Sequence, residues 1–259
     1  MSQPAASPLL PTIAFIGGGN MASAIIGGLI HQGHPASQIE VVEPWAEARE
    51  ALRKNYGIEA QAEAGPALQR AQIVVWAVKP QTFRDAAAQA KAHTQGALHL
   101  SVAAGIRSDS IAQWLGTERI VRTMPNTPAL VGKGMSALYA RPAVSAPERQ
   151  SIEAIMATTG EFLWVDSEPQ LDAVTALSGS GPAYVFYFLE AMTRAGTGMG
   201  LTEQQAHQLA VGTFVGASEL ARRSDDPPSV LRQRVTSKGG TTHAALQSME
   251  HDAVAEKFM

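Results

Sequence analysis

The sequence predicts an α/β domain with a largely parallel sheet, followed by an all-helical domain. Over the first part of the chain, short apolar runs alternate with helical segments, as expected where helices cover both faces of a parallel sheet. Three glycines, 17–19, separate the first apolar run from the first helical segment. From Pro169 onward no segment has the pattern of a strand. We therefore place the two domains at residues 1–165 and 166–259.

The strands of the first domain are predicted from apolar runs that suit a strand buried on both faces. These runs are Ile13–Ile16, Ile39–Val42, Ile73–Val78, Ala97–Ala103 and Arg119–Thr123.

Two helices are predicted between these strands. Apolar residues recur on one helical face after the glycine cluster, and this helix should end at Gly33, because glycine is common at helix ends. A second helix is predicted over Ala46–Asn55.

The second domain is predicted to begin with an apolar helical segment, Asp172–Gly196, which Ser178–Pro182 interrupts. Thr202 and Gln205 have capping-box spacing and predict the start of a long helix that runs to about Arg223.

Residues 224–228 should end this long helix. A short helix should follow, and the turn Ser237–Gly240 should precede a final helix. So few helices would leave large apolar faces exposed, which predicts a homodimer or a higher homo-oligomer.

Composition excludes several classes of protein. The 20 Lys and Arg residues nearly balance the 23 Asp and Glu residues, so a basic surface that binds nucleic acid or an anionic membrane is not expected. Hydrophobic residues make up 45% of the chain, which excludes global disorder. The absence of cysteine excludes disulfides, a thiolate nucleophile and cysteine-ligated zinc. No apolar run suits a membrane helix and the start lacks a signal-peptide pattern, so we expect a cytoplasmic protein.

Gly17, Gly19 and Ala22 match the G-x-G-x-x-G/A pattern of a dinucleotide-binding turn. The first glycine permits a tight turn, and the second lets backbone N–H groups approach a pyrophosphate. The small third residue allows close packing of helix and strand. The predicted strand before the turn and the helix after it indicate a Rossmann-type domain that binds NADH or NADPH.

Glu43 follows the second predicted strand, near the usual position of an acidic residue that binds the adenosine ribose. In that role it would favour NADH, because a carboxylate repels a 2′-phosphate. The alternative is a solvated glutamate at a strand end. Arg49 and Lys54 lie downstream and could meet a 2′-phosphate, so the sequence leaves the choice between NADH and NADPH open.

The sequence contains no obvious proton donor or metal site. Its histidines share no motif, and no H-E-x-x-H, P-loop or nucleophile-elbow pattern occurs. The unusual segment of the second domain is Val235–Thr242, where hydroxyls and glycines precede a helix. Such a helix start can bind a carboxylate or phosphate, or it can be an ordinary turn with Thr241 or Thr242 as N-cap.

Five segments together resemble the pyrroline-5-carboxylate reductase family. They occur in the family's order and span nearly the whole chain. The last is the most specific, and it differs from the family at Lys238, where proline is usual. The five segments are Phe15–Met21, Ala77–Pro80, Arg122–Pro128, Leu177–Tyr184 and Leu231–Thr242.

The resemblance implies a Rossmann domain joined to a helical domain whose helices interlock in a homodimer. It implies hydride transfer from NAD(P)H to the C=N carbon of 1-pyrroline-5-carboxylate, which yields L-proline in the last step of proline biosynthesis. The cofactor would lie on residues of the first and third strand ends, together with the predicted ribose ligand: Gly17, Gly19, Asn20, Met21, Ala77, Lys79 and Pro80, with Glu43.

The resemblance also implies where the substrate binds. The substrate carboxylate would lie on the turn that contains Ser237, Gly240, Thr241 and Thr242. The Thr242 hydroxyl would lie near the ring nitrogen as the catalytic group. Residues of the segment 124–126 would line the nicotinamide side, and Met124 and Asn126 would contact the substrate.

Two alternatives remain open at this point. A β-hydroxyacid dehydrogenase has similar domains but uses a lysine on the first long helix of its second domain. Here that helix has no lysine, and the first lysine of the second domain is Lys238, in a later turn. A non-catalytic NAD(P)-binding sensor would fit the first domain but would leave the hydroxyl-rich turn of the second unexplained.

Overall fold

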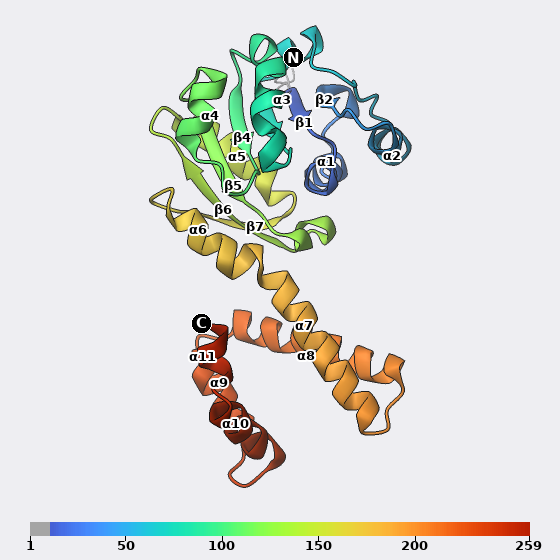
Figure 1. Ribbon diagram of the computed structural model, residues 1–259, viewed down its shortest axis with the longest axis vertical. Coiled ribbons are helices and arrows are strands. Elements are labelled where there is room, and N and C mark those ends of the chain that lie inside the picture. Colours follow the sequence, from blue (N-terminus) through green and yellow to red (C-terminus); the bar gives the residue numbers. More distant parts are fainter. Residues whose placement is uncertain (1–10) are drawn as a thin grey trace, which may run out of the picture. The chain divides into compact units, whose positions relative to one another are not determined.

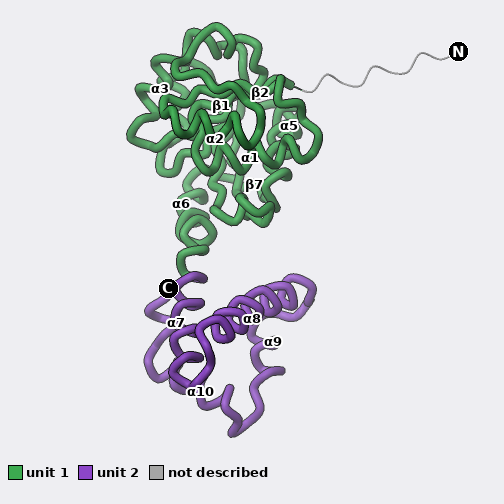
Figure 2. Tube along the Cα trace, turned by 90° about the vertical axis from the view of Figure 1, so that its right-hand side faces the viewer, with its two compact units in different colours: residues 1–184 green, residues 185–259 purple. Residues whose placement is uncertain are grey.

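The computed structural model describes residues 11–259. Its internal contacts divide the chain into unit 1, which ends at Tyr184, and unit 2, which runs from Val185 to Met259 (Figure 2). The division falls inside helix α7 (Gly181–Gly198), which the two units share. The predicted domain boundary after residue 165 follows the end of the last strand, at Trp164.

Unit 1 contains a seven-stranded sheet with the order β2-β1-β3-β4-β5-β6-β7 (Figure 1). All neighbours are parallel except β5 and β6. β1 lies between β2 and β3, so the chain reverses its direction of travel across the sheet beside β1. Ligands of such sheets bind at that point, beyond the carboxyl ends of the strands. The strands are β1 (Ile13–Ile16), β2 (Ile39–Val42), β3 (Ile73–Trp76), β4 (Leu98–Ser101), β5 (Ile120–Met124), β6 (Gly134–Ala140) and β7 (Gly160–Trp164).

The five predicted strands all form, with ends that differ by at most a few residues. β1 and β3 are buried at every position, which explains their continuous apolar sequence. β6 and β7 were not predicted from the sequence. β7 alternates half-buried and exposed residues because it is the edge of the sheet, and such a short alternating segment gives a weak signal.

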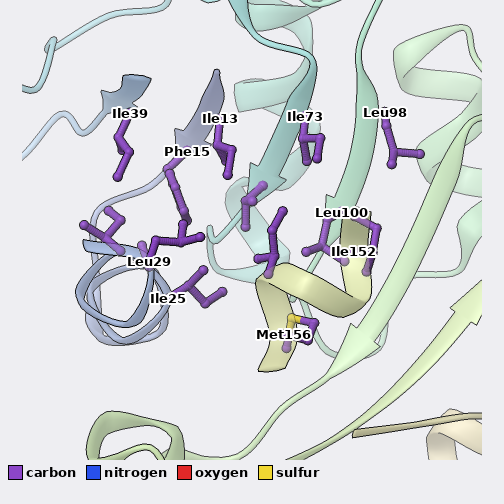
Figure 3. Packing of buried hydrophobic residues seen from close by; sticks show 14 of the residues in the cluster. Ile13, Phe15, Ile25, Leu29, Ile39, Ile73, Leu98, Leu100, Ile152 and Met156 are labelled. Atoms are coloured by element: carbon purple, nitrogen blue, oxygen red, sulfur yellow. The ribbon is translucent and has the colours of Figure 1, made fainter. Parts of the chain in front are cut away.

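Helices cover both faces of the sheet. Helices α1 and α5 pack on one face, where Ile25 of α1 and Ile152 of α5 join a buried cluster with Phe15 and Leu100 (Figure 3). Helices α3 and α4 pack on the other face, through residues such as Phe83. The α-helices that begin in unit 1 are α1 (Asn20–His31), α2 (Ala46–Tyr56), α3 (Phe83–Ala90), α4 (Ser108–Leu115), α5 (Ala146–Ala157) and α6 (Gln170–Val174), with α7 as above.

Unit 2 is helical throughout, as predicted. Thr202 is the N-cap of α8, and it forms the predicted capping box with Gln205. Many large apolar side chains of this unit are exposed in the single chain, among them Phe186 and Tyr187 at 57% and 65%. The helices that follow α7 are α8 (Glu203–Arg223), α9 (Pro228–Arg234), α10 (Thr241–His251) and α11 (Val254–Phe258). None of the helices between residues 11 and 259 combines the length and the apolar character that a membrane crossing needs.

A buried ion pair ties the segment after β7 to the sheet. The Arg122 guanidinium of β5 donates to Glu168 over 2.7 Å, and the two side chains are 5% and 12% exposed. The two carboxylate oxygens also accept the backbone N–H and the hydroxyl of Ser108, at the start of α4. Burial raises the pKa of Glu168, but these hydrogen bonds and the nearby charge outweigh it and leave the pKa below its usual value.

Glu168→Gln should therefore lower the free energy of unfolding by roughly 3 kcal/mol, because it leaves the Arg122 charge buried without a counter-charge. Urea unfolding measures the change. The matched control is Asp172→Asn, which breaks an exposed pair with Arg107 and should cost less than about 1 kcal/mol. Equal effects of the two variants would contradict this account.

The same pair predicts acid sensitivity. The Glu168 carboxylate has a lowered pKa in the folded protein, so its contribution is present above the pKa of the unfolded chain. It is lost as the pH falls through the lowered folded-state pKa. The stability difference between wild type and Glu168→Gln should therefore shrink below that range in urea titrations at decreasing pH.

Candidate functional site

The turn between β1 and α1 can be made only with glycine at its first position. Gly17 has φ +98°, a region that side chains disfavour, and a Cβ there would lie 2.5 Å from the carbonyl oxygen of Ala77. The Gly17 N–H donates to the Val42 carbonyl, and the Ala77 N–H donates to the Ile16 carbonyl. The ends of β1, β2 and β3 are thus hydrogen-bonded to one another at the turn.

Gly19 faces open space instead. It is exposed, and a Cβ built on it would meet no atom within 4 Å. Gly19 is also the N-cap residue of α1, whose first residues are Asn20 and Met21. The N–H groups of a helix start have no partner within the helix, and they favour an anion. Ala22, the third small residue of the motif, is fully buried, which allows the helix to pack closely on the sheet. The glycine turn and the start of α1 therefore fit a dinucleotide pyrophosphate.

Glu43 is buried, with 5% of its surface exposed, so it is not a solvated strand-end residue. Its Oε2 accepts the Gly18 N–H over 2.7 Å, and its Oε1 accepts the Trp45 N–H over 2.9 Å. Each carboxylate oxygen retains a lone pair for a further donor. The side chain of Arg49 donates to the carbonyls of Glu43 and Pro44, so this cation lies beside the same strand end.

The end of β3 supplies the remaining predicted cofactor residues. Ala77 is half-buried beside Gly17, as described above. Lys79 and Pro80 follow at the surface, where Pro80 begins a short 3₁₀ helix (Pro80–Thr82). The structure thus brings Gly17 and Ala77 together, and Glu43 lies beside Gly18 in the same turn.

The end of β5 lies against a π-helical turn, η6 (Thr175–Gly179). Asn126 spans this contact, because its Oδ1 accepts the Met135 N–H over 2.9 Å and its Nδ2 donates to the Ser178 carbonyl over 3.0 Å. Gly179 approaches the side chain of Met124 so closely that a Cβ there would lie 2.5 Å from Cε. Met124 and Asn126 were predicted as site residues from the family resemblance, but no sequence pattern predicted their contacts with η6.

The hydroxyl-rich turn lies in unit 2, at the start of α10. The N-cap of α10 is Gly240, with no side-chain cap, so the alternative in which Thr241 or Thr242 caps the helix is wrong. Thr241 and Thr242 are the first two helical residues, and both are exposed. The first bond of this helix runs from the Ala244 N–H to the Gly240 carbonyl, so the preceding amides lie at an open helix start.

Two histidines are buried, and burial lowers the pKa of each. Burial, together with the charge of Arg119, lowers the pKa of His99 to about 4. Its Nδ1 accepts the Trp76 indole N–H over 3.0 Å, which holds the ring between strands. Burial also lowers the pKa of His34. Over residues 11–259, no three potential metal-ligating side chains gather into a group.

Comparison with known protein families gives two matches. Residues 168–259 match the family model described as pyrroline-5-carboxylate reductase dimerisation. Residues 12–105 match the family model described as NADP oxidoreductase, coenzyme F420-dependent. The first match covers the helices after the sheet, and the second covers the glycine turn and the strands around it.

Curated relatives match nearly the whole chain. The pyrroline-5-carboxylate reductase of Pseudomonas aeruginosa is 46% identical over 242 residues, which cover 93% of this chain and 89% of that protein. The enzyme of the same name from Haemophilus influenzae is 42% identical and covers 90% of this chain and 87% of its own length.

Solved structures agree with these relatives. A pyrroline-5-carboxylate reductase from Coxiella burnetii has 36% identity and a TM-score of 0.87, and the match covers 96% of this chain and 93% of the other. A pyrroline carboxylate reductase from Plasmodium falciparum, solved with NADP bound, has 27% identity and the same TM-score and coverage.

The open space at Gly19 predicts the outcome of Gly19→Ala. The fold should tolerate the methyl group, because Gly19 has φ −74° and no neighbour. The methyl group would occupy the space that a pyrophosphate needs, at the cost of at least one hydrogen bond to a charged group, so NAD(P)H affinity should fall on the order of 10–100-fold. Fluorescence titration measures the affinity, and a thermal melt checks the fold. An unchanged affinity in a folded variant would exclude this turn as the cofactor site.

Proposed function

The chain belongs to the pyrroline-5-carboxylate reductase family, and we propose that it reduces the C=N bond of 1-pyrroline-5-carboxylate with a hydride from NAD(P)H, giving L-proline. The observation that carries the proposal is the glycine turn of unit 1, shaped for a pyrophosphate, in a chain whose relatives of this name match it over nine-tenths of its length. The direct test is oxidation of NAD(P)H that depends on added pyrroline-5-carboxylate.

Unit 1 holds the nucleotide in this proposal. The pyrophosphate binds at the start of α1, against Gly17, Gly19, Asn20 and Met21. Ala77, Lys79 and Pro80 flank it, and Met124 lines the nicotinamide side. The bound nucleotide supplies a hydride, and the residues at the strand ends orient it.

Glu43 binds the hydroxyls of the adenosine ribose in this proposal. Its position supports the role, because hydrogen bonds from two backbone N–H groups fix the carboxylate at the end of β2. Such a fixed negative charge would repel a 2′-phosphate.

The turn at the start of α10 binds the substrate carboxylate. Ser237 and Thr241 contribute hydroxyl and backbone N–H donors, while Gly240, whose N–H donates to the Ser237 carbonyl over 3.0 Å, shapes the turn. Thr242 places its hydroxyl oxygen to accept a hydrogen bond from the protonated ring nitrogen. The open helix start of α10 supports this role, since its amides and dipole favour an anion.

The reaction does not require a strong acid from the protein. A cyclic imine is reduced more readily once its nitrogen is protonated, and that iminium form is accessible near neutral pH. The protein then contributes chiefly by holding the imine carbon at the nucleotide in a reactive geometry. This agrees with the pKa of about 4 for the buried His99, which makes it a poor proton donor at neutral pH.

We also propose that two copies of unit 2 associate as a homodimer. The exposed apolar side chains of its helices support this, as does the dimerisation family model that residues 168–259 match. A stable monomer at micromolar concentration in analytical ultracentrifugation would contradict it.

Glu43→Gln tests the ribose contact. The amide keeps the volume of the side chain but loses the charge that repels a 2′-phosphate, so the ratio of kcat/KM for NADPH to that for NADH should rise. Measuring both cofactors on one preparation cancels any loss of stability. An unchanged ratio would leave Glu43 as a purely structural acceptor for the Gly18 and Trp45 amides.

Thr242→Ala tests the substrate turn. Loss of a hydrogen bond to a charged group costs roughly 1.5–3 kcal/mol, so kcat/KM for pyrroline-5-carboxylate should fall on the order of 10–100-fold. NAD(P)H affinity should be unchanged. The melting temperature should hardly move, because Gly240 and not Thr242 is the N-cap.

The control is Thr213→Ala, which removes an exposed hydroxyl that bonds only within α8, to the Leu209 carbonyl. It should leave kcat/KM unchanged. A normal kcat/KM for Thr242→Ala, or an equal loss in the control, would remove Thr242 from the proposed site.

A further inference from the structure

The π-helical turn η6 contains a carbonyl that its own helix cannot satisfy. In a regular helix the Ser178 carbonyl would accept the N–H of the residue four positions later. That residue is Pro182, which has no N–H. The Ser180 N–H donates to the Thr175 carbonyl, five positions back, and the Ala183 N–H donates to the Ser180 carbonyl. The Ser178 carbonyl therefore needs a donor from outside the helix.

Asn126 supplies that donor. Its Nδ2 lies 3.0 Å from the Ser178 carbonyl oxygen, and its Oδ1 is held by the Met135 N–H of β6. The second bond fixes the orientation of the amide group, so that the NH₂ group faces η6. The sheet and the helical segment are thus joined by one side chain with a defined orientation.

The bond between Asn126 and Ser178 also affects the surroundings of Met124. With η6 held in place, Gly179 lies against the Met124 side chain, where even one methyl group would come within 2.5 Å of Cε. Met124 is the last residue of β5, and it lines the proposed nicotinamide site. Any shift of η6 would therefore change the space available to Met124.

We propose that Asn126 is a positioning residue of this reductase, which replaces the donor that Pro182 lacks and so holds Gly179 against Met124. The inference rests on the proposed placement of the nicotinamide beside Met124. It gives Asn126 a role through η6 in addition to the expected contact with substrate. It also explains how η6 is held in place although the helix is interrupted at Ser180, between η6 and α7.

The test is a double-mutant cycle of Asn126→Ala and Pro182→Ala. Asn126→Ala should lower kcat on the order of 10–100-fold through misplacement at the reacting centre, with NAD(P)H affinity unchanged. The primary isotope effect with 4-deuterated NAD(P)H should rise as hydride transfer becomes slower. In the Pro182→Ala background, residue 182 can donate to Ser178, so the penalty of Asn126→Ala should be smaller. Asn55→Ala, an exposed asparagine of α2, is the control and should behave as wild type.

Several outcomes would overturn the proposal. One is an equal kcat penalty in both backgrounds, which would mean that Asn126 acts only by touching substrate. Another is a lowered melting temperature with normal kcat and isotope effect, which would mean that the bond is only structural. These results are independent of Thr242→Ala, whose failure would affect the substrate turn alone.

A second cycle applies if Asn126→Ala does not fold. Gly179→Ala should lower kcat because its methyl group displaces Met124, and it should cause little further loss in the Met124→Ala background, where Cε is gone. Equal losses in the two backgrounds would show that the contact between Gly179 and Met124 does not position the site.

Discussion

The parallel pairing of β1 with β2 on one side and β3 on the other determines where unit 1 can bind a ligand. Parallel strands end at the same edge of a sheet, and the chain leaves β1 at the point where the strand order reverses. The turn after β1 must then pass beside the Ala77 carbonyl, which only a glycine at position 17 permits. The open helix start of α1, the buried Glu43 and the end of β5 all lie at this edge of the sheet.

Backbone groups without a regular partner are satisfied by side chains from distant segments. Glu43 accepts the Gly18 N–H, Glu168 accepts the first N–H of α4, and Asn126 donates to a carbonyl that a proline leaves free. A buried polar group without a partner costs more than a typical hydrogen bond gains. These three side chains therefore determine loop positions that the sheet alone would not.

Much of this architecture could be predicted from local sequence. The five central strands are continuous apolar runs, and the Thr202 and Gln205 capping box is a local pattern, so both were predicted correctly. The glycine motif predicted the turn of unit 1 because its spacing reflects backbone geometry. β7 was missed because an edge strand with alternating exposure lacks a continuous apolar run, and β6 because Gly134 and Ser136 interrupt its apolar residues although most of the strand is buried.

The rest depends on residues far apart in the chain. Arg122 pairs with Glu168, and Asn126 bonds to Ser178, and no local pattern relates positions so distant. The glycine and proline of residues 178–182 suggested an interruption of the helix. A π-helical turn forms there instead, and its Ser178 carbonyl is bonded to Asn126, which follows β5. The alternative in which Thr241 or Thr242 caps α10 was wrong, because Gly240 occupies the N-cap position although threonine is the commoner cap.

The exposed apolar side chains of unit 2 link folding to protein concentration. If Phe186, Tyr187 and their neighbours are covered only by a second copy, association and folding of this unit form one coupled equilibrium. The free energy of unfolding then changes by about 1.4 kcal/mol of dimer for each tenfold change in concentration. Dilution alone would destabilise the helices that carry the Ser237–Thr242 turn, while the sheet of unit 1, which has its own core, would be unaffected.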